Sequence, residues 1–140
     1  MADEVTSGTD VSPISDDDVV YRRIRDDGVN VVASGSGDRP SSAAFEPDDD
    51  GLSVFLGSEL DSNGIEVRDV VEGMTGEYRI AALAVSDIRG FGLQVVRDAN
   101  PADAPAHPAN PAHGLVKFPD LSRKKLHRVR RSLAEMAKWV

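Results

Sequence analysis

The sequence predicts an α+β fold: a mainly antiparallel sheet of about six short strands, one small helix, and a C-terminal amphipathic helix packed on the sheet. The first supporting observation is a series of short apolar segments separated by clusters of Gly, Pro and Asp, which is typical of strands. The second is the helical spacing of apolar side chains in residues 126–140. A length of 140 residues favours a single domain.

The N-terminal segment is predicted to be disordered. Residues 1–18 carry six acidic side chains, no basic side chain and few apolar ones. Such a segment buries too little apolar surface to offset the entropy that it loses on ordering. We therefore expect an acidic tail over residues 1–18 and a single α+β domain over residues 19–140.

The first strand is expected over residues 19–24, where the alternation of VVYRRI puts Arg22 on one face and Arg23 on the other. A turn at residues 26–28 and the apolar residues 29–33 predict a second strand that forms a hairpin with the first. Because an interior arginine needs a carboxylate or a ligand anion, we expect the inward-facing arginine of this strand to be paired within the structure.

The central part of the sequence alternates between loops and short elements. The Gly and Ser residues at 34–42 predict a loop, and residues 41–45 (SSAAF) fit either a strand or one turn of helix. After a turn at residues 47–51, the apolar residues 52–56 predict a buried strand. Helical spacing over residues 65–74 predicts the small helix.

Further strands are expected in the second half of the chain. Residues 78–85 and 91–97 give the strongest strand signals, and the short segment SDIRG between them predicts an antiparallel hairpin. The Pro- and Ala-rich residues 100–111 predict an extended surface loop. Residues 114–118 predict the last strand.

The C-terminal helix is the best-defined element of the sequence. Asp120 or Ser122 is expected to cap its start. The cations in its first turn are disfavoured by the helix dipole by a few tenths of a kcal/mol each, so we expect this charge to serve something other than the helix itself. The apolar side chains form one stripe that is expected to pack on the sheet, namely Leu126, Val129, Leu133, Met136 and Val140.

Composition excludes several classes of function. The chain has no Cys, which excludes disulfides, thiolate zinc sites and cysteine nucleophiles. The longest apolar run, residues 80–85, is far shorter than the about 20 residues of a membrane span. The N-terminus lacks the basic and apolar regions of a signal peptide. We therefore expect a cytoplasmic protein with no membrane partner.

Charge is distributed unevenly along the chain. Residues 121–140 hold seven Lys or Arg and one acid, Glu135, whereas the whole chain has a net charge of −8. This balance excludes a uniformly basic nucleic-acid binder and leaves a local basic site open. The candidate binding residues lie on the basic arc of the C-terminal helix, and they are Arg123, Lys124, Arg128, Arg130 and Arg131.

The histidines predict no metal site. His107 and His113 lie six residues apart near the Pro-rich loop, and this spacing matches no pattern of metal ligands, so both are expected to be exposed. His113 is the better candidate for chemistry because it opens a strand, where packing can fix its ring. His127, on the polar face of the C-terminal helix, is expected to be solvated.

Several segments resemble a family of small uncharacterised bacterial proteins. Those proteins share a strand bearing Tyr-Arg-Arg, a Pro-Ser-Ser-x-x-Phe segment and an Arg-Asp … Asn-Pro-Ala-His sequence. Here the matching segments are VVYRRI, RPSSAAF, LSVFL, VVRDANP, NPAHGLV and the terminal KWV. The similarity covers residues 19–140 in order and implies no known activity. This sequence has a longer loop between Asp98 and Asn110, so the resemblance does not fix where Asp98 lies relative to His113.

A second similarity has more chemical content. An Arg on the first strand, then a Ser segment after a Gly-rich loop, then an apolar strand, resembles the opening of ADP-ribosyltransferase-like and RES-type domains. In those domains the Arg and Ser hold the phosphates and nicotinamide ribose of NAD. The resemblance implies NAD as cofactor and, as catalytic candidates, Arg22 (or Arg23) with Ser41 (or Ser42). The late catalytic Glu of that pattern has no counterpart here, and His113 is the polar residue nearest to its place.

The sequence is compatible with three functions. The first is a non-enzymatic interaction module that presents the basic C-terminal helix to a protein partner and needs no cofactor. The second is an NAD-binding enzyme, or a remnant of one, built on Arg22, Ser41, Ser42 and His113. The third is a weak nucleic-acid binder that uses the basic helix, which lacks interleaved aromatic residues. The first is favoured, because no complete catalytic set is evident.

Overall fold

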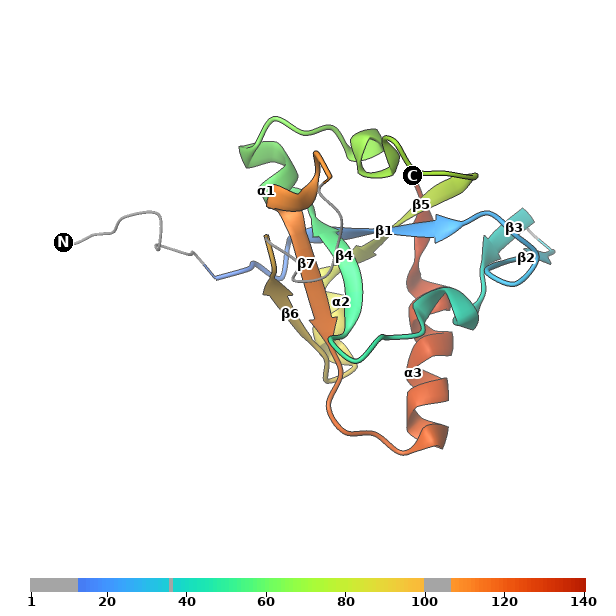
Figure 1. The fold of residues 1–140 in the computed structure, drawn as a ribbon. Coiled ribbons are helices and arrows are strands. Elements are labelled where there is room, and N and C mark those ends of the chain that lie inside the picture. Colours follow the sequence, from blue (N-terminus) through green and yellow to red (C-terminus); the bar gives the residue numbers. More distant parts are fainter. Residues whose placement is uncertain (1–12, 36, 100–106) are drawn as a thin grey trace.

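The structure is a computed structural model that describes residues 13–35, 37–99 and 107–140. Its centre is a six-stranded antiparallel sheet (Figure 1). In chain order the strands are β1 (Val19–Arg25), β4 (Leu52–Leu56), β5 (Tyr78–Ala84), β6 (Gln94–Arg97), β7 (His113–Lys117) and β8 (Lys138–Trp139). Their order across the sheet is β6-β7-β4-β1-β5-β8. The predicted α+β class is thereby confirmed.

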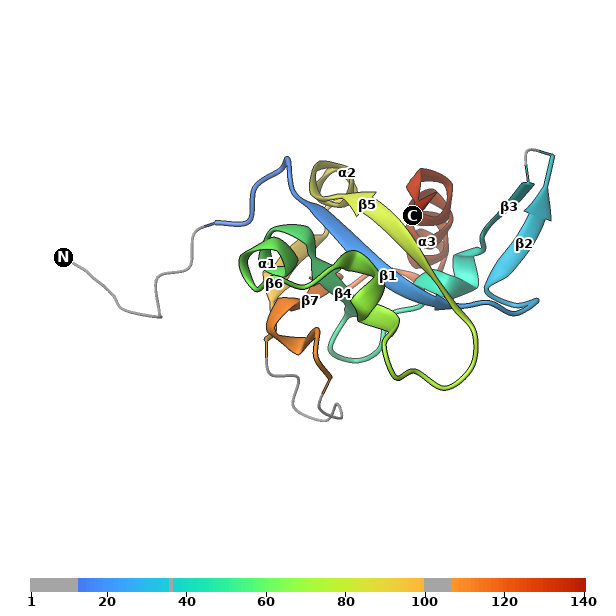
Figure 2. The same cartoon turned by 90° about the horizontal axis from the view of Figure 1, so that it is seen from above.

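Helices cover both faces of this sheet (Figure 2). One face, which we call the α3 face, carries the 3-10 helix η2 (Ser42–Phe45), α2 (Val85–Gly90) and α3 (Arg123–Met136). The other, the α1 face, carries α1 (Gly57–Ser62) and the 3-10 helices η3 (Val67–Val71) and η4 (Asn110–Ala112). The α3 face holds the larger core, in which Phe45, Leu52, Leu83 and Leu133 are fully buried.

The strand β1 contributes to both cores, as the alternation of VVYRRI predicts. Val20 and Ile24 are buried in the core of the α3 face, whereas Tyr21 packs against the core of the α1 face. Arg22 and Arg23 follow the same alternation, so neighbouring guanidinium groups lie on opposite faces of the sheet.

The predicted hairpin between residues 19–24 and 29–33 is wrong. β1 pairs with β4 and β5, whereas β2 (Val31–Ser34) pairs with β3 (Gly37–Pro40) in a separate two-stranded sheet. The Asp27 carboxylate accepts hydrogen bonds from the backbone N–H groups of Val29 and Asn30 at 3.0 and 2.8 Å. This turn directs the chain away from β1. The same pairing corrects the loop predicted over residues 34–42.

The second predicted hairpin, between residues 78–85 and 91–97, is also wrong. The two strands lie in different halves of the sheet, since β5 pairs with β1 and β8 while β6 pairs with β7 at the opposite edge. The connection contains the helix α2. Its residues Val85 and Ile88 are fully buried on the α3 face. This three-residue spacing is helical, and the helix carries the chain across the face of the sheet.

The short central elements agree in part with the prediction. Residues 42–45 form one turn of helix, one of the two alternatives, and residues 52–56 form the predicted buried strand. The turn at residues 47–51 closes through a bridge between Asp48 and Gly51. The predicted helix over residues 65–74 is reduced to the 3-10 helix η3, and α1 was not predicted.

The C-terminal helix α3 is docked on its face of the sheet and begins after Ser122, whose Oγ accepts a hydrogen bond from the N–H of Lys125. Of the predicted apolar stripe, Leu133 is fully buried, and Leu126 and Val129 are partly buried. Met136 is 42% exposed and Val140 70% exposed. The stripe ends early because the chain leaves the helix at Ala137 and forms β8 against β5.

Packing begins before Val19, the predicted start of the domain. Ile14 is buried in the core of the α3 face, and Arg89 on α2 donates to the Ile14 carbonyl at 2.7 Å and pairs with Asp16. Two observations thus attach residues 13–18 to the domain: one buried apolar side chain and one arginine. The rest of the predicted tail, residues 1–12, lies outside the described residues.

Candidate functional site

Arg22, the first catalytic candidate, is bound inside the α3 face. Its Nε donates to the carbonyl of Ala44 at 2.6 Å and its Nη1 to the carbonyl of Ser53 at 2.8 Å. Burial lowers its pKa to about 10, which leaves the guanidinium charged at neutral pH. The interior arginine is therefore paired, as expected, although its partners are backbone carbonyls and not a carboxylate.

Ser41 and Ser42 lie elsewhere, at the surface between η2 and α3. The hydroxyl of Ser41 donates to the carbonyl of Val29 at 2.5 Å, and the carbonyl of Ser42 accepts from Arg130 Nε at 3.2 Å. Both serines line a groove of about 270 Å³ that also includes Arg131. The structure thus brings Ser41 and Ser42 to the basic helix.

His113 lies on the opposite, α1 face of the sheet. The catalytic candidates therefore occupy three places: Arg22 is bound to the backbone on the α3 face, the two serines are at the edge of α3, and His113 is across the sheet from both. They do not form one site, so their positions lend no support to NAD binding by this set.

The imidazole of His113 is buried, at 6% exposure, and both of its nitrogens have partners. Nδ1 lies 3.0 Å from the carbonyl oxygen of Asp98 and 3.3 Å from its carboxylate. Nε2 lies 2.5 Å from the hydroxyl oxygen of Ser53 on β4. The prediction of an exposed residue 113 is wrong. Pairing of Phe55 with His113 places both rings on the α1 face, where they meet edge to face at 5.5 Å.

The hydrogen bonds of His113 determine its tautomer. Both oxygens next to Nδ1 are acceptors, so Nδ1 carries the proton and Nε2 accepts from the Ser53 hydroxyl. Burial lowers the pKa of His113 below its ordinary value; Asp98 acts to raise this pKa, and Arg23 acts to lower it. The ring is therefore neutral at neutral pH, with its lone pair directed at Ser53.

Arg23 is a cation whose charge acts on His113. Its guanidinium lies 4.8 Å above the ring of Phe55, and its Nη1 donates to the carbonyl of Val70 at 2.9 Å. Desolvation lowers the pKa of Arg23. Phe55 therefore contacts two polar groups, with Arg23 over its face and the His113 ring nearly perpendicular to its own.

Sequence reasoning singled out His113 and missed Ser53. The signal for Ser53 is weak: it is the polar position between Leu52 and Val54, both buried on the α3 face, so alternation places its side chain on the α1 face. From the sequence, Asp98 was named only as a residue whose position relative to His113 the resemblance does not fix. No group of three or more potential ligands able to hold a metal ion occurs among the described residues.

The basic helix forms a second candidate site. Arg130 is tied into the fold, since its Nη1 lies 3.1 Å from Glu46 and its Nε donates to Ser42. The other cations are exposed and form no ion pair with any described residue, and we call them the free cations of α3: Arg123, Lys124, Lys125, Arg128 and Arg131. Two of them, Arg123 and Lys124, line a groove of about 840 Å³ together with Leu121, Leu126 and the Arg130–Glu46 ion pair.

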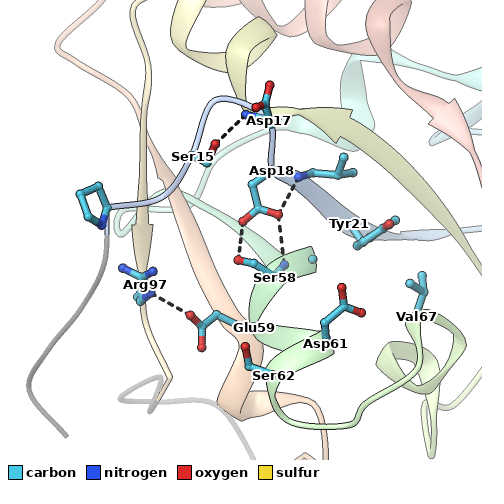
Figure 3. A pocket seen from close by; sticks show the side chains of 13 residues that line it. Ser15, Asp17, Asp18, Tyr21, Ser58, Glu59, Asp61, Ser62, Val67 and Arg97 are labelled. Atoms are coloured by element: carbon cyan, nitrogen blue, oxygen red, sulfur yellow. Dashed lines mark hydrogen bonds and ion pairs between the residues drawn. The ribbon is translucent and has the colours of Figure 1, made fainter. Parts of the chain in front are cut away.

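A third hollow, of about 770 Å³, is acidic and lies where residues 13–18 meet α1 (Figure 3). Asp18 accepts from the hydroxyl of Ser58 at 2.6 Å and from its N–H at 3.1 Å. Glu59 pairs with Arg97 Nε at 3.0 Å. These bonds attach residues 13–18 and β6 to α1, so the two acids have a structural role.

The chain was compared with family models, curated proteins and solved structures, and nothing matched. Both resemblances noted in the sequence therefore stay predictions. Within the described part of the chain, no helix is long and apolar enough to cross a membrane. The function must therefore be inferred from the basic helix and the His113 cluster themselves.

Proposed function

We propose that the protein is an interaction module that presents the basic surface of α3 to an acidic segment of a protein partner. The observation that carries this proposal is the set of free cations of α3, two of which, Arg123 and Lys124, line the groove of Leu121 and Leu126. An acidic peptide with apolar side chains matches both properties of this surface.

The charge on α3 does not stabilise the helix. Arg123, Lys124 and Lys125 form its first turn, where the helix dipole disfavours cations by a few tenths of a kcal/mol each. No acidic side chain lies in that turn to compensate. Because the chain as a whole has a net charge of −8, these cations form a local basic surface on an acidic protein. Such a surface accelerates encounter with an acidic partner.

The groove favours a protein partner over a nucleic acid. Leu121 and Leu126 offer an apolar anchor, and anchors in grooves contribute much of the affinity at protein interfaces. Surfaces that bind single-stranded nucleic acid instead combine cations with stacked aromatic side chains, and residues 123–131 contain no Phe, Trp or Tyr. The net negative charge also opposes phosphate binding.

The test uses a short fluorescein-labelled peptide that is rich in Asp and Glu and contains Leu at two positions. Fluorescence anisotropy measures its affinity for the full chain, for Lys124→Glu/Arg128→Glu and for the matched control Arg68→Glu/Lys117→Glu. Reversal on α3 is expected to weaken binding about tenfold or more at low salt, since each exposed ion pair contributes about 0.2–1 kcal/mol. The control changes net charge equally at exposed sites away from α3.

Three outcomes overturn the proposal. The proposal fails if the peptide does not bind, if the two double variants lose affinity equally, or if a DNA duplex binds more tightly than the peptide. The last outcome replaces the protein partner with a nucleic acid.

A further inference from the structure

The cluster of Ser53, Asp98 and His113 lies on the α1 face, and the proposed role of α3 makes no use of it. Ser53 Oγ is 2.5 Å from His113 Nε2, and Asp98 holds the other ring nitrogen. We propose that these residues form an active site of the serine type, in which Ser53 Oγ is a nucleophile towards esters of short carboxylic acids.

The base and its orienting group are both in place. A general base must lie within hydrogen-bond reach of the proton that it removes, and a third group must fix its tautomer. His113 Nε2 meets the first condition at Ser53, and the two Asp98 oxygens meet the second at Nδ1. The backbone reinforces the arrangement, since the N–H of Asp98 donates to the His113 carbonyl at 2.9 Å.

Ser53 lies where two strands of the sheet separate. Pairing between β1 and β4 stops at Tyr21 and Phe55, and the Ser53 carbonyl is bound by the side chain of Arg22 instead of by the β1 backbone. The Ser53 side chain is only partly buried. Two functions of the arginine pair follow: Arg22 fixes the backbone of the nucleophile from the α3 face, and Arg23 supplies positive charge on the reacting face.

The surroundings set the class of substrate. Ser53 lines none of the grooves described above, and it lies on the α1 face, partly open to solvent. A short acyl group on an ester that approaches from solvent fits this position. Positive charge from Arg23 favours the negative charge that develops on the carbonyl oxygen.

The reaction balances with water as the co-reactant. Ser53 Oγ attacks the carbonyl carbon while its proton passes to His113 Nε2. The bond to the leaving oxygen then breaks, and His113 protonates the departing alcohol. Water attacks the resulting acyl-Ser53 ester, again losing a proton to His113, and that proton returns to Ser53 Oγ as the carboxylic acid leaves. No oxidant, reductant or metal is required.

The experiment is covalent labelling of the full chain with a fluorophosphonate, followed by intact mass and peptide mapping. Ser53 Oγ is expected to displace fluoride and form a stable phosphonyl ester, and Ser53→Ala is expected to abolish labelling. His113→Gln is expected to slow it by about 10²-fold or more, the range of general-base catalysis. Ser58→Ala is the matched control: its hydroxyl is bound to Asp18 without a histidine, and its removal leaves labelling unchanged.

A second measurement uses the unaltered protein, so it does not depend on the folding of a variant. The labelling rate is expected to fall once the pH is low enough for His113 to take up a proton, and because burial lowers its pKa this happens at a pH lower than the ordinary value of about 6.5. The charged and titratable described groups around this ring are Asp98, Arg23 and, next to Phe55, His107. The proposal is overturned if Ser53 stays unlabelled, if its labelling rate is independent of pH through this range, or if folded His113→Gln reacts as fast as the wild type.

Discussion

The two faces of the sheet differ in what they contribute. Among the described residues, the α3 face buries a cluster of seventeen apolar residues, whereas the cluster on the α1 face has five. The α1 face in turn holds the hydrogen-bonded group around His113. The comparison teaches that one side of a single sheet supplies most of the stability, while the other has room for buried polar groups that apolar packing would exclude.

The neighbouring residues Arg22 and Arg23 show this difference at the scale of one residue. Arg22 is partly buried beside the larger core, where it binds the carbonyls of Ala44 and Ser53. Arg23 donates to one described carbonyl, that of Val70, and to the Sδ of Met74, and it stacks on Phe55. Alternation along a strand is therefore enough to give adjacent arginines a structural and an electrostatic role.

The largest expected effect compares Leu133→Ala on the α3 face with Leu60→Ala on the α1 face. Both side chains are buried, but the neighbours of Leu60 form a smaller cluster that collapses more readily around a cavity. Urea unfolding should give losses of about 4–5 kcal/mol for Leu133→Ala and about 2–3 kcal/mol for Leu60→Ala. An equal or larger loss for Leu60→Ala contradicts the proposed division between faces.

The second comparison replaces the adjacent arginines by an apolar chain of similar length. Arg22→Met leaves two carbonyls without a donor, at a cost of about 1–3 kcal/mol each, but it also removes the desolvation penalty of the guanidinium, so we expect a net loss of about 2–4 kcal/mol in the free energy of unfolding. Arg23→Met removes one such bond and should lose about half as much. Chemical denaturation measures both, and the reverse order argues against the structural role of Arg22.

A third prediction concerns pH. The pKa of folded His113 is lowered, so the unfolded chain binds the proton more readily than the folded chain. The stability that this neutral histidine contributes is therefore present above the ordinary pKa of about 6.5 and is lost as pH falls through the folded-state pKa. Thermal denaturation across this range should show the decline in the wild type and a weaker decline in His113→Gln. Identical stability profiles for the wild type and His113→Gln would show that His113 does not cause the decline.

The smallest effect is expected at the start of α3. Lys124→Glu replaces an exposed cation by an anion in the first turn, where the helix dipole favours negative charge. The free energy of unfolding should rise by about 0.3–1 kcal/mol. Thermal melts at low salt measure this change, and 1 M NaCl should suppress it through screening. A loss of stability means that Lys124 has a structural role that its exposure does not indicate.

Elements with a local signal could be predicted from the sequence. The apolar stripe of Leu126, Val129 and Leu133 predicted the helix α3, and the apolar residues 52–56 predicted the strand β4. The partner of each strand could not be predicted from the sequence. The pairing of Arg22 with Ala81, for example, joins residues far apart in the chain and depends on the whole sheet. Short segments were ambiguous: SDIRG fits a turn until Val85 and Ile88 are both found in the core.

The candidate sites were predictable to different degrees. The free cations of α3 follow from helical periodicity alone, because the charges and the apolar stripe belong to one element. Ser53, Asp98 and His113 come from three strands or their ends, and only the order β6-β7-β4 brings them together. Sequence alternation indicates the face of each residue but not its neighbour on that face.

The two-residue strand β8 makes one further property of the molecule measurable. Trp139 pairs with Ala81, donates its indole N–H to the carbonyl of Asp38 on β3, and lies under Arg79 with the guanidinium carbon 3.8 Å from the ring centre. Because it is the chain's single tryptophan, its intrinsic fluorescence arises at the junction of the β2–β3 sheet, the β5 edge and the end of α3. Detachment of any of these from the others should shift the emission without a label.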